Sequence, residues 1–154
     1  MKNSILIPSI IALSFLVCFI QTYPTGAPKC SSKVPKHESH KPQTGESPYT
    51  LTAKKNGKTA TVGISGGSFK GFFIYAVQPG SSDMIGTFQT SDKVKELSCG
   101  SASAATHANE KSKNSITLTW KAPDNFSGEV EFKATVVKEF KEFWAGITSS
   151  SLKF

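Results

Sequence analysis

Two stretches of strict period-two alternation, joined by turn-forming residues, constrain the fold of this chain more than any other feature. Apolar residues occupy every second position from 116 to 120, ending at Trp120, and do so again from 130 to 136. This alternation predicts two strands, each with one buried and one solvent-facing side. Pro123 and the Ser-Gly pair at 127–128 predict a turn between them. The pair could form a hairpin or an arch that connects two sheets, and both alternatives remain open at this level.

Similar short runs fill most of the chain from residue 49 onward. The run at 69–77 is apolar on both faces, which is typical of a central strand covered on both sides. The Asn56-Gly57 pair predicts a tight hairpin turn, and the small polar residues at 100–114 predict a long loop. No segment shows a convincing 3.6-residue period. An all-β, antiparallel two-sheet sandwich of seven to eight strands is therefore expected. Its expected strands are 49–53, 59–65, 69–77, 84–89, 94–99, 116–121, 130–137 and 143–148.

The first 22 residues have the pattern of a cleaved export signal. Lys2 precedes an apolar run from Ile5 to Ile20, and this run is about as long as a secretory signal allows. We expect cleavage near Thr22, which leaves residues 23–154, a length that suits one ordinary domain. No later run is long enough to span a bilayer. The chain is therefore expected to be secreted and extracellular.

The cysteine count depends on that signal. Cys18 lies within it, so the exported chain keeps Cys30 and Cys99. In an oxidising compartment, two cysteines predict one disulfide. Two free thiols are the alternative. A disulfide closing a loop of this size stabilises a fold by about 4 kcal/mol in the chain-entropy model.

Positive charge is concentrated near the N-terminus. All 18 basic residues are lysines, and the formal net charge is +7. Seven lysines and two acids lie between residues 23 and 58, whereas ten lysines and nine acids lie between 59 and 154. Residues 23–48 are rich in proline and poor in large apolar side chains, which indicates an extended leader rather than a core element. The positive field therefore belongs mainly to the N-terminal quarter of the chain.

The lysines of this quarter are candidates for binding an acidic polymer. Lysine is a compact point charge without bidentate geometry, which suits a repetitive and chemically variable partner such as lipopolysaccharide or another acidic glycan. A solvated, solubilising surface is the alternative. Nucleic acid is not an expected partner, because a chain without arginine lacks the commonest bidentate contact to guanine. The candidates are Lys29, Lys33, Lys36, Lys41, Lys54, Lys55 and Lys58.

A formal catalytic motif is present but lies in the wrong context. Residues 63–67 match G-x-S-x-G, with Ser65 as the nucleophile and Asp83 or Asp92, then His107, downstream. An esterase would need Ser65 at a strand-to-helix turn of a large α/β sheet. Strand-like residues flank this motif on both sides, so a glycine-rich strand connection is the simpler interpretation. We expect no catalytic residue.

Histidines supply only a weak set of metal ligands. His37 and His40 lie in the proline-rich leader, and His107 is distant in sequence. Structural metal sites usually combine four closely spaced ligands. We therefore expect surface histidines, no metal site and no cofactor.

Three further side chains have specific expectations. Asn125 opens an Asn-Phe-Ser sequon in the predicted turn and is a candidate for N-glycosylation in an exported protein. Trp120 is expected in the core. Trp144 is out of phase with Phe143 and Ile147, so it is expected to cover the second face of its sheet or to lie exposed.

Several of these segments, in their order and spacing, resemble the reeler domain family. The segments are YPTGAPKC, the Lys-His after Pro35, SPYTL, GFFIYAV, GTF, LSCG, THANEKSKNSITLTWKAP, SGEVEFKATVV and FWAGITSS. The chain looks most similar to the single-domain insect defence proteins of the noduler-like group, over about residues 23–149. This resemblance implies an immunoglobulin-like sandwich with one disulfide, here Cys30 to Cys99. It also implies secretion and a role in innate immunity through binding to microbial surfaces, with no catalytic motif to carry over.

The expected function is therefore that of a secreted defence protein that binds microbial surface components without catalysis. The alternative is an extracellular adhesion or matrix module that uses the same basic surface on host glycosaminoglycans.

Overall fold

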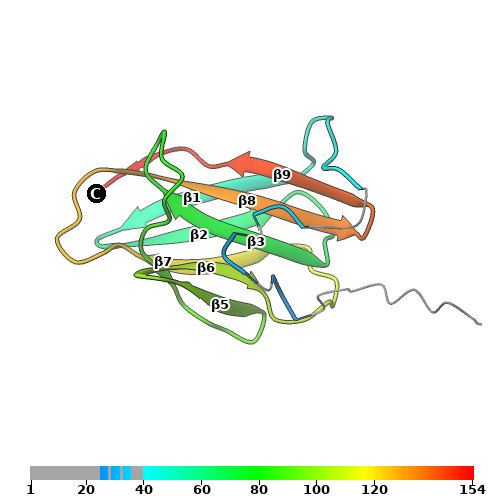
Figure 1. Ribbon diagram of the computed structural model, residues 1–154, viewed down its shortest axis with the longest axis horizontal. Helices are drawn as coiled ribbons and strands as arrows, with labels where there is room; N and C mark the ends of the chain where they lie inside the picture. Colours follow the sequence, from blue (N-terminus) through cyan, green and yellow to red (C-terminus); the bar gives the residue numbers. More distant parts are fainter. Residues whose placement is uncertain (1–24, 28, 32, 36–39) are drawn as a thin grey trace, which may run out of the picture.

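The computed structural model describes residues 25–27, 29–31, 33–35 and 40–154, and in this part of the chain all regular structure is β-strand. Two antiparallel sheets pack against each other as a sandwich (Figure 1). No helix that could cross a membrane occurs in the described residues. The expected signal, with Cys18 and the cleavage position, lies outside the described residues, as do Lys36 and His37.

Ten strands of the described residues build the two sheets. The four-stranded sheet has the order β1-β2-β7-β4, and the six-stranded sheet has the order β10-β8-β3-β6-β5, with β9 also paired to β8. The strands are β1 (Thr50–Asn56), β2 (Thr59–Ser65), β3 (Gly71–Val77), β4 (Thr87–Phe88), β5 (Val94–Cys99), β6 (Ala102–His107), β7 (Ile116–Lys121), β8 (Glu129–Glu139), β9 (Glu142–Thr148) and β10 (Leu152–Lys153). The predicted all-β sandwich is confirmed. Two strands, β6 and β10, go beyond the eight expected, and the strand expected at 84–89 is only the two-residue β4.

The two alternating stretches form an arch between the sheets, not a hairpin. β7 pairs with β2 in the four-stranded sheet, whereas β8 pairs with β3 in the six-stranded sheet. The inward side chains of both strands therefore meet across the sandwich. Trp120 is fully buried, as expected, and its ring packs edge-on against Phe132 of β8 with 5.4 Å between centroids. Its indole Nε1 donates a hydrogen bond to Ile85 O at 3.0 Å, so the one polar atom of this core side chain is satisfied.

The predicted loop at 100–114 is wrong in its first half, because residues 102–107 form β6. This strand pairs with β3 and β5 and is buried along nearly all its length. Its sequence, ASAATH, is small and shows no apolar alternation, since both of its faces are covered. On the inner side, Ser103 Oγ accepts a hydrogen bond from Phe88 N of β4 in the opposite sheet at 2.8 Å. Strands covered on both faces lose the alternation that identifies a half-buried strand.

The β1–β2 hairpin is confirmed, with its turn one residue later than the Asn-Gly pair suggests. Asn56 pairs with Thr59, so the two loop residues are Gly57 and Lys58. Gly57 has φ of +60°. A positive φ at the first central position is the geometry in which glycine is favoured.

Trp144 lies on the core side of β9, contrary to both expected positions. The strand contains an irregularity: Val136 pairs with Trp144 and Ala134 pairs with Ile147, so two steps on β8 match three on β9. Gly146 has φ of +75° within this irregularity. A bulge of this kind reverses the phase of alternation. Trp144 and Ile147 therefore both pack against the core, and Phe143 faces the outer side of the sheet.

The leader crosses the outer face of the six-stranded sheet (Figure 1). Ala27 N donates to Thr106 Oγ1 on β6 at 3.0 Å, and Gln43 N donates to Phe143 O on β9 at 2.8 Å. At Gly26 the approach is so close that a Cβ atom would lie 2.6 Å from the Thr106 methyl group. The central strand β3 is accordingly covered on both sides, as predicted, and Phe73 on its outer face is only 4% exposed.

Candidate functional site

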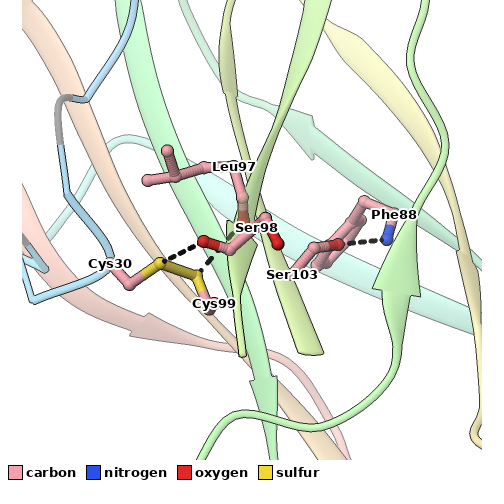
Figure 2. The surroundings of a disulfide bond; sticks show 6 residues. All are labelled: Cys30, Phe88, Leu97, Ser98, Cys99 and Ser103. Carbon is pink, nitrogen blue, oxygen red and sulfur yellow. Dashed lines mark hydrogen bonds between the residues drawn. A yellow bond between two sulfur atoms is a disulfide. The ribbon is translucent and has the colours of Figure 1, made fainter. Parts of the chain in front are cut away.

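A disulfide holds the leader to the edge strand of the six-stranded sheet. Cys30 and Cys99 are bonded, which confirms the predicted pair. Figure 2 shows Cys30 on the leader and Cys99 at the end of β5, with Cys30 Sγ 3.1 Å from Ser98 O. Three serines, Lys33 and Asp83 are among the residues around an open depression beside this bond. The disulfide therefore joins two segments that are 69 residues apart in the chain.

The six described candidate lysines occupy three separate parts of the molecule. Lys29 and Lys33 lie on the leader over the six-stranded sheet, Lys41 lies further along the leader, and Lys54, Lys55 and Lys58 belong to the β1–β2 hairpin. These lysines, although close in the sequence, therefore do not share one surface.

Two of these lysines have defined contacts. Lys33 Nζ donates to Ser82 O at 3.0 Å and lies 5.0 Å from the centroid of the Tyr75 ring. Lys55 Nζ donates to Lys153 O at 2.8 Å and lies 4.9 Å from the centroid of the Phe154 ring. Both ammonium groups hold parts of the fold together, since each bridges segments distant in the chain.

Two lysines outside the predicted set adjoin the hairpin. Lys121 of β7 pairs with Thr59, and Lys153 of β10 supplies the carbonyl that accepts from Lys55. Acids are also present: Asp124 lies 3.8 Å from Lys121, and Glu129 pairs with Lys153 in the sheet register. Sequence reasoning missed both lysines because only strand pairing places them beside the hairpin.

The formal G-x-S-x-G motif lies in strand β2 and the turn that follows it. Ser65 is the last residue of β2, is exposed, and pairs with Thr50. The next described element after this turn is strand β3, not a helix. His107 lies in the other sheet, where its Nδ1 accepts a hydrogen bond from Phe72 N at 3.2 Å. The local geometry is that of a strand end, in agreement with the simpler interpretation.

The described histidines have aromatic or backbone contacts. His40 packs edge-on against Phe140 with 5.8 Å between centroids. Within the described residues, no group of three or more His, Cys, Asp or Glu side chains is arranged to hold a metal. Trp144 packs edge-to-face with Tyr49, with 5.5 Å between centroids, and is partly buried against the core.

Burial shifts the pKa values of Tyr49, Tyr75 and Lys113. Desolvation raises the pKa of Tyr75, with Lys133 acting against this effect and Glu131 adding to it. Desolvation, with a smaller contribution from Lys93, lowers the pKa of Lys113. Lys113 is only 6% exposed, and its Nζ donates to three backbone carbonyls. The contacts indicate that this ammonium group is structural.

Residues 28–154 match the Reeler domain family. The chain belongs to the reeler domain family. This assignment confirms the resemblance seen in the sequence, and it covers the leader from residue 28, the disulfide and both sheets.

Defence proteins and ferric-chelate reductases are among the curated relatives of this reeler domain. "Putative defense protein 3" of Antheraea mylitta is 35% identical over 153 residues, which are 92% of this chain and 92% of that protein. "Putative ferric-chelate reductase 1" of Danio rerio is also 35% identical, over 89% of this chain but only 26% of its own length. The similarity to the second protein therefore concerns one part of a much longer chain.

Solved reeler domains have the same fold. The human F-spondin reeler domain aligns with a TM-score of 0.60 and 22% identity, covering 75% of this chain and 94% of that one. At this identity the likeness concerns the fold alone.

Proposed function

We propose that this reeler domain is a secreted innate-immunity protein that binds acidic polymers on microbial surfaces and carries out no catalysis. One observation supports it most: the chain corresponds over nearly its whole length, and nearly the whole length of the relative, to a protein named as a defence protein. The ferric-chelate reductase relatives give no support for catalysis, because they share only a quarter of their length with this chain.

Charge gives this proposal a physical basis. A formal net charge of +7, carried entirely by lysines, attracts polyanions without demanding one geometry. Interactions between exposed charges are screened by salt within about 10 Å at 0.1 M ionic strength. Binding that depends on these lysines must therefore weaken as salt concentration rises.

A pull-down of the mature protein on lipopolysaccharide, peptidoglycan, β-glucan and heparin, at two salt concentrations, tests this proposal. We expect capture on lipopolysaccharide that falls steeply between the low and the high salt concentration, and little capture on neutral β-glucan. Capture that is equal at both salt concentrations would contradict the electrostatic account. Absence of capture on every acidic polymer would contradict the proposed function.

The second candidate is an adhesion or matrix module that binds host glycosaminoglycans. The same lysine-only charge supports it, because host glycosaminoglycans are acidic polymers as well. Competition on intact bacteria separates the two candidates. If heparin displaces the protein from bacteria at far lower concentrations than soluble lipopolysaccharide does, the second candidate is favoured. If soluble lipopolysaccharide displaces it at far lower concentrations than heparin does, the first candidate is favoured.

A further inference from the structure

The two outer faces of the sandwich differ in what lies over them. On the six-stranded sheet, the outward side chains of Phe73, Thr106 and Thr135 are buried, and the leader forms hydrogen bonds with Thr106 and Thr135. On the four-stranded sheet, the outward side chains of β1, β2 and β7 are exposed or half-exposed along the whole length of each strand. Among the described residues, only this second sheet therefore presents an uncovered outer face.

Threonine and lysine dominate this uncovered face. Thr61 of β2 lies directly between Lys54 of β1 and Thr119 of β7 in the sheet register. Lys121 of β7 lies directly between Thr59 of β2 and Thr87 of β4. We call the six residues Thr52, Lys54, Thr61, Thr117, Thr119 and Lys121 the threonine face. Neither an acidic nor an outward aromatic side chain occurs in the strands β1, β2, β4 and β7 that carry it.

Strand geometry makes this face a regular array of hydroxyl groups. Neighbouring strands are about 4.8 Å apart, and side chains on one face repeat about every 6.6 Å along a strand. Each threonine hydroxyl can both donate and accept a hydrogen bond. Because threonine is stiff at χ1, little rotamer freedom is lost when such a hydroxyl is held by a ligand.

The charge on this face is positive and available. Lys54 is exposed on β1, and Lys121 has only a long, exposed ion pair of 3.8 Å with Asp124. Exposed pairs of this kind contribute little energy, with a median of about 0–1 kcal/mol. Lys33 on the leader differs, because its ammonium group already holds Ser82 O and the Tyr75 ring. The hairpin side of the molecule therefore offers the freer cations.

We propose that the threonine face is the surface on which an extended acidic polysaccharide lies. The two lysines contact the acidic groups, and the threonine hydroxyls exchange hydrogen bonds with the sugar hydroxyls. This inference rests on the proposed function and assigns it to a surface. Neutral polysaccharides bind this face weakly, because it has no aromatic ring on which a sugar could stack.

Heparin, used as a soluble acidic polysaccharide, tests the lysines. The variant K54Q/K121Q removes two charges from the threonine face, and the matched control K29Q/K41Q removes two exposed charges from the leader. We expect the first variant to bind heparin about tenfold more weakly. The slope of log affinity against log salt concentration should also become less steep by about two. We expect less than about a twofold change for the control.

The variant T61V/T119V tests the hydroxyl groups. Valine keeps the shape and the strand preference of threonine and removes the hydroxyl, so folding is retained. We expect heparin affinity to fall about fivefold, in line with the loss of neutral hydrogen bonds, with an unchanged salt slope. The control T90V/T148V changes two exposed threonines elsewhere and should bind as the unaltered protein does. Thermal unfolding of each variant verifies that it is folded.

The outcomes separate this inference from the proposed function. If the unaltered protein binds neither heparin nor lipopolysaccharide, the proposed function fails. If it binds both, and K54Q/K121Q binds heparin as tightly as K29Q/K41Q does, the threonine face is not the contact surface and the proposed function stands. If only the lysine variant loses affinity, the hydroxyl contacts are refuted and the face acts through charge alone.

Discussion

Thr135 on β8 donates a hydrogen bond from its Oγ1 to the carbonyl oxygen of Lys33, which precedes it by 102 residues, at 2.6 Å. Thr135 is only 2% exposed, so the leader itself is what buries this outward side chain. The disulfide of Cys30 lies three residues earlier on the same segment. The leader is thus a covering layer of the six-stranded sheet rather than an appendage.

The disulfide should contribute a large share of the stability. A bond between residues separated by 69 positions removes chain entropy from the unfolded state equivalent to about 4 kcal/mol. We expect C30S/C99S to lower the free energy of unfolding by about that amount, as measured by urea denaturation. Hydrogen exchange at Ala104–Thr106 should accelerate at the same time, since the leader would leave β6. Unchanged exchange there would show that the leader stays in place without the bond.

Gly86 should tolerate no side chain. A Cβ atom at this position would overlap the Trp120 indole and lie 2.5 Å from Lys121 O, at a φ of +67°. We expect G86A to destabilise the fold by about 3 kcal/mol or more, through backbone strain and displacement of a core ring. The matched variant G80A has a φ of +79° but nothing within 4 Å of the added atom. It should cost only about 1 kcal/mol, and equal melting temperatures for the two variants would refute the overlap.

Tyr75 should reduce stability at alkaline pH. Desolvation raises its pKa above the ordinary value of 10.0, so the folded state keeps the phenolic proton to higher pH than the unfolded chain does. The stability contributed by this proton is fully present below pH 10.0 and is lost as pH rises through the folded-state pKa. Urea denaturation across this pH window should show a decline that is smaller in Y75F. An identical decline in both proteins would exclude Tyr75 as its source.

Lys113 should stabilise the fold through its hydrogen bonds to backbone carbonyls. Its Nζ donates to Lys70 O at 3.0 Å, Asn109 O at 2.8 Å and Lys111 O at 2.7 Å. Methionine would retain the apolar stem but leave these carbonyls without this donor, at a cost of about 2–3 kcal/mol. The control K111M changes an exposed lysine of the same loop and should alter the free energy of unfolding by less than about 0.5 kcal/mol. If both variants unfold at the same urea concentration, the three bonds contribute no net stability.

Asn125 should carry a glycan when the protein is exported from a eukaryotic cell. It is exposed at the tip of the arch with φ of +61°, and both features suit a sequon that an oligosaccharide must reach. We expect the intact mass of the secreted protein to fall on enzymatic deglycosylation, and N125G to show no such change. Glycine tolerates the same backbone conformation, so this variant should fold normally. An unmodified mass of the secreted protein would contradict the prediction.

The local sequence pattern determined the bounds of several strands, the disulfide pair and the family of this protein. The bounds of β2, β5 and β7 agree with the runs expected at 59–65, 94–99 and 116–121, because side chains alternate in any extended strand whatever its neighbours. The disulfide pair followed from the number of cysteines left after the expected signal, and the reeler family from the order of short segments.

Tertiary structure decided the rest, because hydrogen bonds between strands join residues that are distant in sequence. Because β7 pairs with β2 and β8 pairs with β3, the stretch between β7 and β8 forms an arch. The bulge at Gly146 turns Trp144 toward the core. Covering by the leader allowed the small residues of β6 to form a buried strand. Only the register of β1, β2 and β7 brings Lys54, Thr61 and Thr119 side by side, and no local periodicity encodes which strands become neighbours.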